Sequence, residues 1–318
     1  MKRVLKAEVL ADKSLMTEAE WRAQRRVGIG GSDAAGILGL NPYSSAFQVY
    51  CDKIGLTDGD EDNEAMRQGR DFEAYVAGRF EEATGKKTKN CNYVLISRKH
   101  PYAIANVDRL IVGEKAGLEC KTTSVLNKTD FSAGDVPPQY YVQCMHYIAV
   151  TGAERWYLAI LVLNKGFHVF TIERNEEEIQ ALMSAEETFW RENVLAKQEP
   201  APDGSKKAGE IIKSLYGWGR DDLECDLTPF ENELAALVGV KAQIKELEGK
   251  EDFLKQSIQA YMKEATVGKY DRYSVYWRNE LRCGIDTERL KKEQPELVKA
   301  YTKTTSQRKF IIKEIKDT

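Results

Sequence analysis

Two acidic residues and a lysine stand at a spacing that suits metal-assisted chemistry. Asp108 is followed eleven residues later by Glu119, and Lys121 comes two residues after that. Carboxylate oxygens are the ligands that Mg²⁺ and Mn²⁺ prefer in proteins, and a lysine beside them can orient a water molecule or accept its proton. The pattern predicts a metal-dependent attack of water on a phosphate, provided that folding brings the three side chains together.

A β-hairpin is the element that would bring them together. Period-two patterning predicts strands over 102–112 and 117–123, and a two-residue turn at 114–115 would place Asp108 opposite Lys121. Because side chains two apart on a strand share a face, the second acid would point the same way as these two. The hairpin therefore predicts one face that carries both acids and the lysine.

The same residues also have a plainer interpretation as a structural ion pair. A cross-strand pair between Asp108 and Lys121 is common, and it contributes under ~1 kcal/mol when it is exposed. The apolar flanks at 104–105 and 110–112 instead favour a buried hairpin. Buried charges are costly unless they bind something, and this favours a binding site.

Further helices and strands are expected around this hairpin. Apolar residues at steps near 3.6 and capping signals predict the helices, and period-two runs predict the strands. The expected helices are two within 17–50, separated by a glycine-rich turn, and others at 63–84, 137–150 and 176–197; the additional strands are 92–97, 154–163 and 166–173. This mixture predicts an α/β fold, with a mixed sheet flanked by helices.

The glycine-rich turn is a second candidate site. Its sequence at 28–31 is Gly-Ile-Gly-Gly, and it leads into a helix expected to start near Ser32. Free N–H groups at a helix start can bind a phosphate, although a plain turn between helices is the commoner meaning of such glycines. The turn follows no predicted strand and lacks the third glycine of a dinucleotide-binding fingerprint.

Composition excludes several classes of protein. The 318 residues are 42% hydrophobic and 31% charged, which is ordinary for a globular chain of about two domains. No apolar run reaches the ~20 residues that span a bilayer, and the N-terminus lacks a signal peptide. The six cysteines lie at least 24 residues apart, so no compact zinc or iron–sulfur motif is present. We expect a cytoplasmic protein.

The last third of the chain has a different character. Pro200, Pro202 and Gly204 mark a linker, and beyond it apolar residues between 234 and 261 recur at mixed three- and four-residue steps. This spacing predicts an amphipathic helix pair or a short coiled coil, broken near Gly249.

Three segments are therefore expected: a catalytic domain over 1–199, a linker with amphipathic helices over 200–265, and a small basic module over 266–318. Residues 267–318 hold 13 Lys and Arg against 8 Asp and Glu, a net charge of +5, whereas the whole chain carries −3. The module is expected to run strand, strand, helix, strand, and its charge suits an acidic partner.

Aromatic residues of this module suggest a core. Tyr273, Val275 and Trp277 share one strand face, which predicts that they pack together. Tyr276, on the other face, and the module's cations are then the candidates for contact with DNA or with an acidic protein surface.

The Asp-x10-Glu-Cys-Lys pattern on a hairpin resembles the PD-(D/E)xK nuclease superfamily. More closely, the chain resembles phage exonucleases of the lambda exonuclease/YqaJ recombinase type. The resemblance runs from about Trp21 to Leu195, and four stretches carry it: 25–34, 69–73, 106–108 together with 119–121, and 139–147. It implies a PD-(D/E)xK nuclease-like core with a C-terminal helical or α+β extension.

The resemblance also implies an activity and its metal site. Family members are processive 5′→3′ exonucleases of double-stranded DNA ends, which use two divalent ions, Mg²⁺ or Mn²⁺. Carried over by motif, Asp108 and Glu119 would bind metal, Cys120 would contribute its carbonyl, and Glu73 would help to hold the second ion. Lys121 would orient the attacking water.

The substrate and partners follow from the same resemblance. The 3′ single strands that remain serve recombination by strand annealing, which implies a RecT/Bet-like single-strand annealing protein as a partner. A homo-oligomer, such as a ring-shaped trimer, would keep the duplex threaded. The residues implied in binding the 5′-phosphate or DNA are Arg25, Ser32, Asn106, Gln143, Gln139 and Tyr140, and His146 is a further possible contact to DNA.

Two alternatives remain at this point. A Cas4-like nuclease would hold an iron–sulfur cluster on four cysteines, and the cysteine spacing argues against it. A non-catalytic DNA-end-binding or scaffold protein would be expected to lose its acidic cluster, whereas Asp108, Glu119 and Lys121 are all present.

Overall fold

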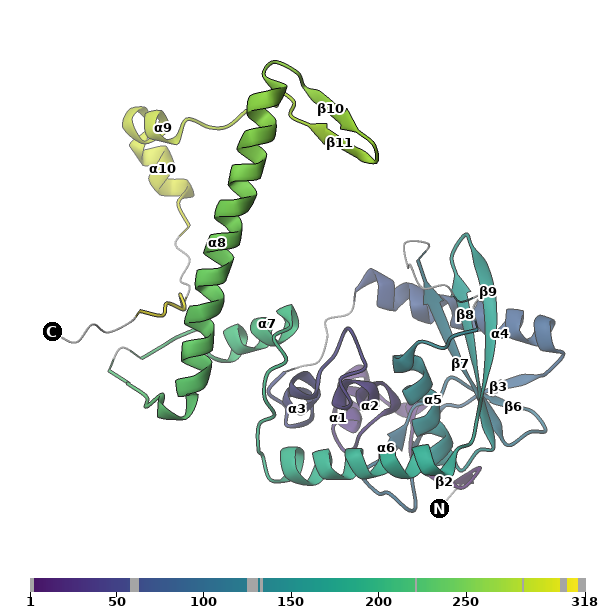
Figure 1. Ribbon diagram of the computed structural model, residues 1–318. Helices are drawn as coiled ribbons and strands as arrows, with labels where there is room; N and C mark the ends of the chain where they lie inside the picture. Colours follow the sequence, from purple (N-terminus) through teal and green to yellow (C-terminus); the bar gives the residue numbers. More distant parts are fainter. Residues whose placement is uncertain are drawn as a thin grey trace. The chain divides into compact units, whose positions relative to one another are not determined.

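The computed structural model describes residues 3–57, 63–124, 131, 134–220, 222–281, 283–303 and 308–313. The chain divides into two compact units, Met1–Leu215 and Tyr216–Thr318. Figure 1 shows the strands β6–β9 and the helices around them in the first unit, and the long helix α8 in the second.

The first unit contains two sheets. Its strands are β1 (Arg3–Val4), β2 (Ala7–Asp12), β3 (Thr88–Asn90), β4 (Tyr93–Ile96), β5 (Ile104–Ala105), β6 (Arg109–Ile111), β7 (Ala116–Thr123), β8 (Arg155–Val162) and β9 (Gly166–Glu173). One sheet has the order β3-β6-β7-β8-β9, and the other has the order β1-β2-β4-β5. In the larger sheet only β7 and β8 are parallel, which confirms the predicted mixed-sheet α/β fold.

Helices surround these sheets. They are α1 (Glu18–Arg25), α2 (Gly31–Ile37), α3 (Ala46–Lys53), α4 (Glu64–Thr84), α5 (Pro138–Thr151), α6 (Glu176–Phe189), which continues as a π-helix over Trp190–Leu195, and α7 (Lys206–Leu215). Local signals explain several of their ends. Thr17 and Glu20 form a capping box at α1, and the Asn63 side chain accepts from the Met66 N–H at the start of α4. Helix α4 ends at Gly85, whose φ of 71° favours glycine.

Strand β8 shows how the layers pack. Tyr157, Ala159 and Leu161 join the apolar cluster that contains Phe80 of α4. The alternate residues of β8, such as Leu158, join the larger cluster formed with helices including α2, α3, α5 and α6. Because a strand buried on both faces cannot alternate with polar residues, β8 reads as a continuous apolar run. Each fully buried large side chain contributes about 1.5–3 kcal/mol.

The predicted strand over 102–112 is interrupted at a position that matters for the site. Strand β5 pairs with β4 in the smaller sheet, whereas β6 pairs with β3 and β7 in the larger one. The chain passes from one sheet to the other over 106–108. Asp108 therefore lies at the junction of the two sheets rather than within one strand.

The predicted register of the hairpin is also wrong, by two residues. Arg109 pairs with Leu118, so Asp108 does not lie opposite Lys121. The cause is the turn, which takes four residues instead of two and includes Gly113 with a φ of 83°. Since the side-chain period of a strand is two, this shift leaves every side chain on its predicted face.

The second unit holds α8 (Glu231–Met262), β10 (Val267–Tyr270), β11 (Tyr273–Tyr276), α9 (Thr287–Glu293) and α10 (Pro295–Tyr301). Helix α8 runs without a break through Gly249, contrary to the prediction, because one glycine costs a helix only about 1 kcal/mol. The predicted last strand is absent from the described residues 308–313, and 304–307 and 314–318 lie outside the described residues.

The predicted aromatic core of the second unit is wrong. Tyr273 is 59% exposed, Val275 37% and Trp277 44%. The hairpin of β10 and β11 forms as predicted, but nothing in the described part of the chain covers these three side chains enough to bury them. None of the described helices has the length and apolar character needed to cross a membrane.

Candidate active site

Asp108 is fixed by a backbone contact at the junction of the two sheets. Its Oδ2 accepts a hydrogen bond of 2.9 Å from the backbone N–H of Cys120 on β7. Burial, and then the negative charge of Glu119, raise the pKa of Asp108 to about 7. This carboxylate therefore lies close to a second one, and the repulsion between them is unfavourable unless a cation lies between them.

Glu119 lies on β7 and is buried, with 3% of its surface exposed. Its Oε1 accepts a hydrogen bond of 2.8 Å from Gln143 Nε2 and lies 2.6 Å from Lys121 Nζ. Its Oε2 is buried and has no hydrogen-bond partner among the described residues. One oxygen of Glu119 is thus held by α5 and the lysine, and the other remains available.

Lys121 lies beside this acid with its ammonium group 5.2 Å from the centre of the Tyr140 ring. Burial lowers the pKa of Lys121, but Glu119 and then Asp108 outweigh that effect and raise the pKa above its usual value. The side chain therefore stays protonated. Of the two roles open to it, orienting a water molecule fits better than accepting its proton.

Glu73 approaches from α4. Its Oε1 lies 3.4 Å from Arg109 Nε, and its side chain is 36% exposed. Burial, and then the negative charge of Asp108, raise the pKa of Glu73. Three acids thus influence one another here, although Glu73 is held by an arginine in the present arrangement.

The residues at this junction fit a divalent cation. Asp108 and Glu73 both have raised pKa values partly because of neighbouring carboxylates, and Glu119 Oε2 is a buried acceptor without a donor. Within the described ranges, however, no three His, Cys, Asp or Glu side chains already form a metal-binding group. Lys121 occupies one side of Glu119, so a cation would have to share this carboxylate with the lysine.

A hydrogen-bond network behind Glu119 includes a residue that the sequence analysis missed. Gln143 Nε2 donates to the Tyr147 hydroxyl at 2.8 Å as well as to Glu119. The Tyr147 hydroxyl in turn donates to the backbone carbonyl of Asn106 at 3.2 Å. Tyr147 follows Gln143 by four residues on α5, and this helical spacing is the signal that could have identified it.

The glycine-rich turn packs directly on this network. A Cβ at Gly31 would lie 2.7 Å from Tyr147 Cε1 and 3.1 Å from Gln143 Cγ, so the position requires glycine. A Cβ at Gly28 would lie 2.6 Å from the Tyr102 carbonyl oxygen. These close approaches mean that the turn is more than a plain connection between helices, because they bring the start of α2 next to Gln143.

Asp33 organises the start of α2. Its Oδ2 accepts from the Gly30 N–H at 2.8 Å and lies 2.6 Å from Lys53 Nζ, which is fully buried. Burial alone would raise the pKa of Asp33, but Lys53 and then Arg25 lower it below its usual value. The N–H groups of Gly31 and Ser32 have no acceptor within the helix, as in any first turn.

The predicted phosphate- and DNA-binding residues divide into two groups. Ser32 is exposed in the first turn of α2, and Arg25 lies with its guanidinium 5.1 Å from the centre of the Trp21 ring. Of the others, Gln143 contacts Glu119 and Tyr140 lies by Lys121, whereas Asn106 contacts Tyr147 through its carbonyl and Gln139 is half-buried in the first turn of α5. The Asn106 Oδ1 atom is buried and has no hydrogen-bond partner among the described residues.

His146 is not a DNA contact. It is fully buried, with Nδ1 2.7 Å from Glu186 Oε1 and Nε2 2.8 Å from the Ile104 carbonyl oxygen. Its two ring nitrogens therefore connect α5 to α6 and to β5. His146 lies on the same helix face as Gln143, but α6 covers it and keeps it from contact with DNA.

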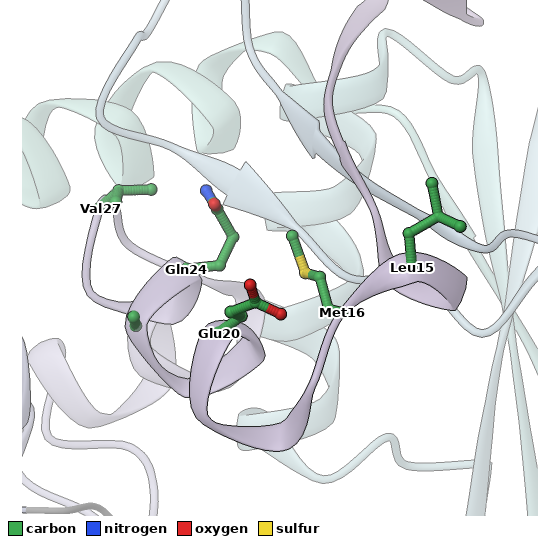
Figure 2. Close-up of a pocket in the computed structure, with 6 residues that line it drawn as sticks. Leu15, Met16, Glu20, Gln24 and Val27 are labelled. Carbon is green, nitrogen blue, oxygen red and sulfur yellow. The ribbon is translucent and has the colours of Figure 1, made fainter.

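A pocket elsewhere on the first unit does not coincide with this site. Figure 2 shows it along α1, lined by Leu15, Met16, Glu20, Ala23, Gln24 and Val27. None of the predicted site residues lines it. The acidic cluster, rather than this mostly apolar surface, carries the chemistry that can be identified.

The chain is similar to several known proteins. Residues 20–154 match the family described as the YqaJ-like viral recombinase domain. The chain is 39% identical to the uncharacterized protein YqaJ of Bacillus subtilis, over 98% of both chains. An alkaline exonuclease from Laribacter hongkongensis is 20% identical, with a TM-score of 0.48 over 56% of this chain and 93% of its own. A phage-related exonuclease from Haemophilus somnus is 13% identical, with a TM-score of 0.42 over 56% of this chain and all of its own.

Proposed function

Because the chain belongs to the family of YqaJ-like viral recombinases, we propose that it is a divalent-metal-dependent exonuclease that processes double-stranded DNA ends for homologous recombination. One observation carries the proposal. Two carboxylates that repel each other, Asp108 and Glu119, lie beside a protonated lysine, and Oε2 of Glu119 is buried without a donor. This arrangement suits a cation and a phosphodiester better than it suits a structural ion pair.

The proposed metal ligands are Asp108, Glu119, the carbonyl of Cys120 and, for a second ion, Glu73. Mg²⁺ or Mn²⁺ bound there would neutralise the charge of the phosphate and acidify a water molecule. Lys121, which stays protonated, would orient that water.

Gln143 has a positioning role in this proposal. Its amide holds one oxygen of Glu119, and Tyr147 holds the amide. The other oxygen of Glu119, Oε2, is thereby left buried and without a donor among the described residues. Preorganisation of this kind avoids a reorganisation cost during the reaction.

We propose further that cleavage runs 5′→3′ and leaves 3′ single strands for strand annealing. The support is the start of α2, where Gly31 packs against Gln143, Ser32 is exposed, and two N–H groups without a helical acceptor could bind a terminal 5′-phosphate; Arg25 lies close enough to Asp33 of this helix to lower its pKa. The proposed partners are duplex DNA ends, a RecT/Bet-like annealing protein and further copies of the chain.

The central experiment is digestion of blunt duplex DNA with and without Mg²⁺. Lys121→Ala should reduce the rate by about 10³-fold, the scale of a lost acid–base or orienting group. Lys115→Ala is the matched control, because Lys115 forms an exposed pair with Glu154 in the hairpin turn. Wild-type rates for Lys121→Ala would refute the site, and end binding without digestion would favour the non-catalytic scaffold.

A second experiment tests polarity. Arg25→Ala should slow digestion of 5′-phosphorylated ends about tenfold more than digestion of 5′-hydroxyl ends, because a charge-assisted contact to the phosphate is lost. Arg22 on the same helix is paired with Glu18, so Arg22→Ala is the control. Equal loss on both substrates would show that Arg25 does not bind the terminal phosphate.

A further inference from the structure

Helix α8 lacks the packing that a long helix needs. Its 32 residues extend for about 48 Å at 1.5 Å per residue. Among them only Met262, at the C-terminal end, has a buried side chain. Gly239 and Gly249 both weaken its intrinsic helicity. Since helical stability in water comes mostly from packing of an apolar face, α8 requires a partner.

Seven apolar residues of α8 lie along one stripe, whereas Leu234, Val238 and Phe253 lie off it. Apart from one step of seven between Leu247 and Leu254, the stripe residues recur at alternating steps of three and four, which is the a/d pattern of a coiled coil. The stripe consists of Leu237, Val240, Ile244, Leu247, Leu254, Ile258 and Tyr261. Glu251 occupies one a position of the same stripe, and Leu247 and Leu254 remain 62% and 61% exposed.

We propose that this stripe pairs with the α8 stripe of a second copy of the chain, in an antiparallel coiled coil. The proposed register places Ile244 of each copy against Leu247 of the other copy. In this register the two copies of α8 overlap over their full length, so that Phe230 of one copy contacts Tyr261 of the other at each end. Phe230 and Tyr261 are 54% and 89% exposed in the single chain.

Charge selects the antiparallel orientation. In a parallel pair, each a residue faces its own copy, so Glu251 would face Glu251 in the seam. Lys250 would also lie beside Lys255 of the second copy at the flanking g and e positions. The antiparallel register instead places Glu251 against Val240 and removes both repulsions.

Charge also selects the register. In the proposed pairing, Lys241 lies beside Glu248 of the second copy, and symmetry produces this contact twice. A shift of one heptad in one direction would bring Glu248 against Glu248 and Lys250 against Lys250. A shift in the other direction would bring Lys241 against Lys241. The one register with full overlap is therefore also the one with attractive flanking charges.

The first experiment measures the mass of the full chain by sedimentation velocity at several concentrations. Leu247→Glu, which puts a charge into the seam, should lower the assembly state by dissociating pairs. Gln256→Glu lies on the outer face of the stripe and should leave the mass unchanged. A wild-type monomer at tens of micromolar, or an assembly insensitive to Leu247→Glu, would overturn the proposal.

A charge exchange tests orientation and register without relying on a disruptive variant. Lys241→Glu and Glu248→Lys should each weaken pairing about tenfold, because two contacts become repulsive. The double variant should restore the wild-type dissociation constant. In a parallel pair residues 241 and 248 are not neighbours across the seam, so failure of the double variant to restore pairing would overturn the proposed geometry. The readout is mass, so the outcome does not depend on whether the chain cleaves DNA.

Discussion

The two units differ in what they leave unsatisfied. The first unit has a large buried apolar core, and its uncompensated groups are charged: Asp108 interacts unfavourably with Glu119 and Glu73, and one oxygen of Glu119 is buried without a donor. In the second unit the charges are solvated and the apolar residues are exposed, along α8 and on the β10–β11 hairpin. The difference matches the two proposals, in which the first unit binds an ion and a phosphate and the second binds an apolar surface.

The largest expected effect separates chemistry from assembly. Glu119→Gln should lower the cleavage rate on a short duplex by about 10³-fold, because the carboxylate that faces the junction becomes neutral. Leu247→Glu should leave that rate unchanged while it alters the mass of the assembly. A comparable loss of cleavage in both variants would mean that the two units do not divide these tasks.

A smaller effect locates the end of the first unit. Ala208 and Ile211 of α7 are buried, at 2% and 5% exposure, in the core of the first unit. A chain that ends at 204 should therefore be less stable than one that ends at 215, by about 3 kcal/mol in the free energy of unfolding. Urea denaturation measures the difference, and equal midpoints would show that α7 does not belong to the folded core.

The carboxylate cluster predicts an unusual pH dependence in the metal-free protein. The folded-state pKa of Asp108 is raised to about 7, well above its unfolded value, so the folded state binds the proton more tightly. Stability should therefore rise as pH falls from 8 towards 5, by up to about 1.4 kcal/mol per pH unit from this group.

The measurement is urea unfolding in a chelator at several pH values. Asp108→Asn should flatten the slope, and Mg²⁺ at pH 8 should stabilise the wild type but not the variant. Parallel slopes for wild type and variant would contradict the assignment of the slope to Asp108.

The smallest expected effect concerns the network behind Glu119. Tyr147→Phe removes one hydroxyl, which should lower kcat about fivefold to tenfold with little change in KM, because Gln143 then holds Glu119 less firmly. Tyr141→Phe is the control, since its hydroxyl donates to Glu178 on the surface. A change in KM alone would place Tyr147 in substrate binding instead.

The sequence predicts local features of this molecule well and non-local ones poorly. The helix predicted over 63–84 follows from neighbouring residues, and it is confirmed as α4, Glu64–Thr84. The strand 102–112 divides between two sheets because β5 pairs with β4 whereas β6 pairs with β3 and β7, and a local period does not encode which strand is the partner. Strands β1 and β2 are missed for the same reason, since β2 pairs with β4 about 85 residues later.

The residues of the candidate site follow the same division. Glu119 and Lys121 share a face of β7 whether the turn takes two residues or four, and Asp108 at the sheet junction is close enough to Glu119 for their charges to interact, so the association of the three is predictable despite the wrong register. Tyr147 was missed because its role depends on a backbone carbonyl and a glycine from other elements.

The parallel pairing of β7 with β8 has a consequence for how the protein folds. Antiparallel neighbours close through short turns, but these two strands meet only after the crossover through α5 has formed. Closing such a long loop is slow compared with forming a hairpin. Gln143, which holds Glu119, lies on that crossover, so the carboxylate is positioned only at this late step. During synthesis, the proposed site can therefore be assembled only after α5 and β8 have left the ribosome.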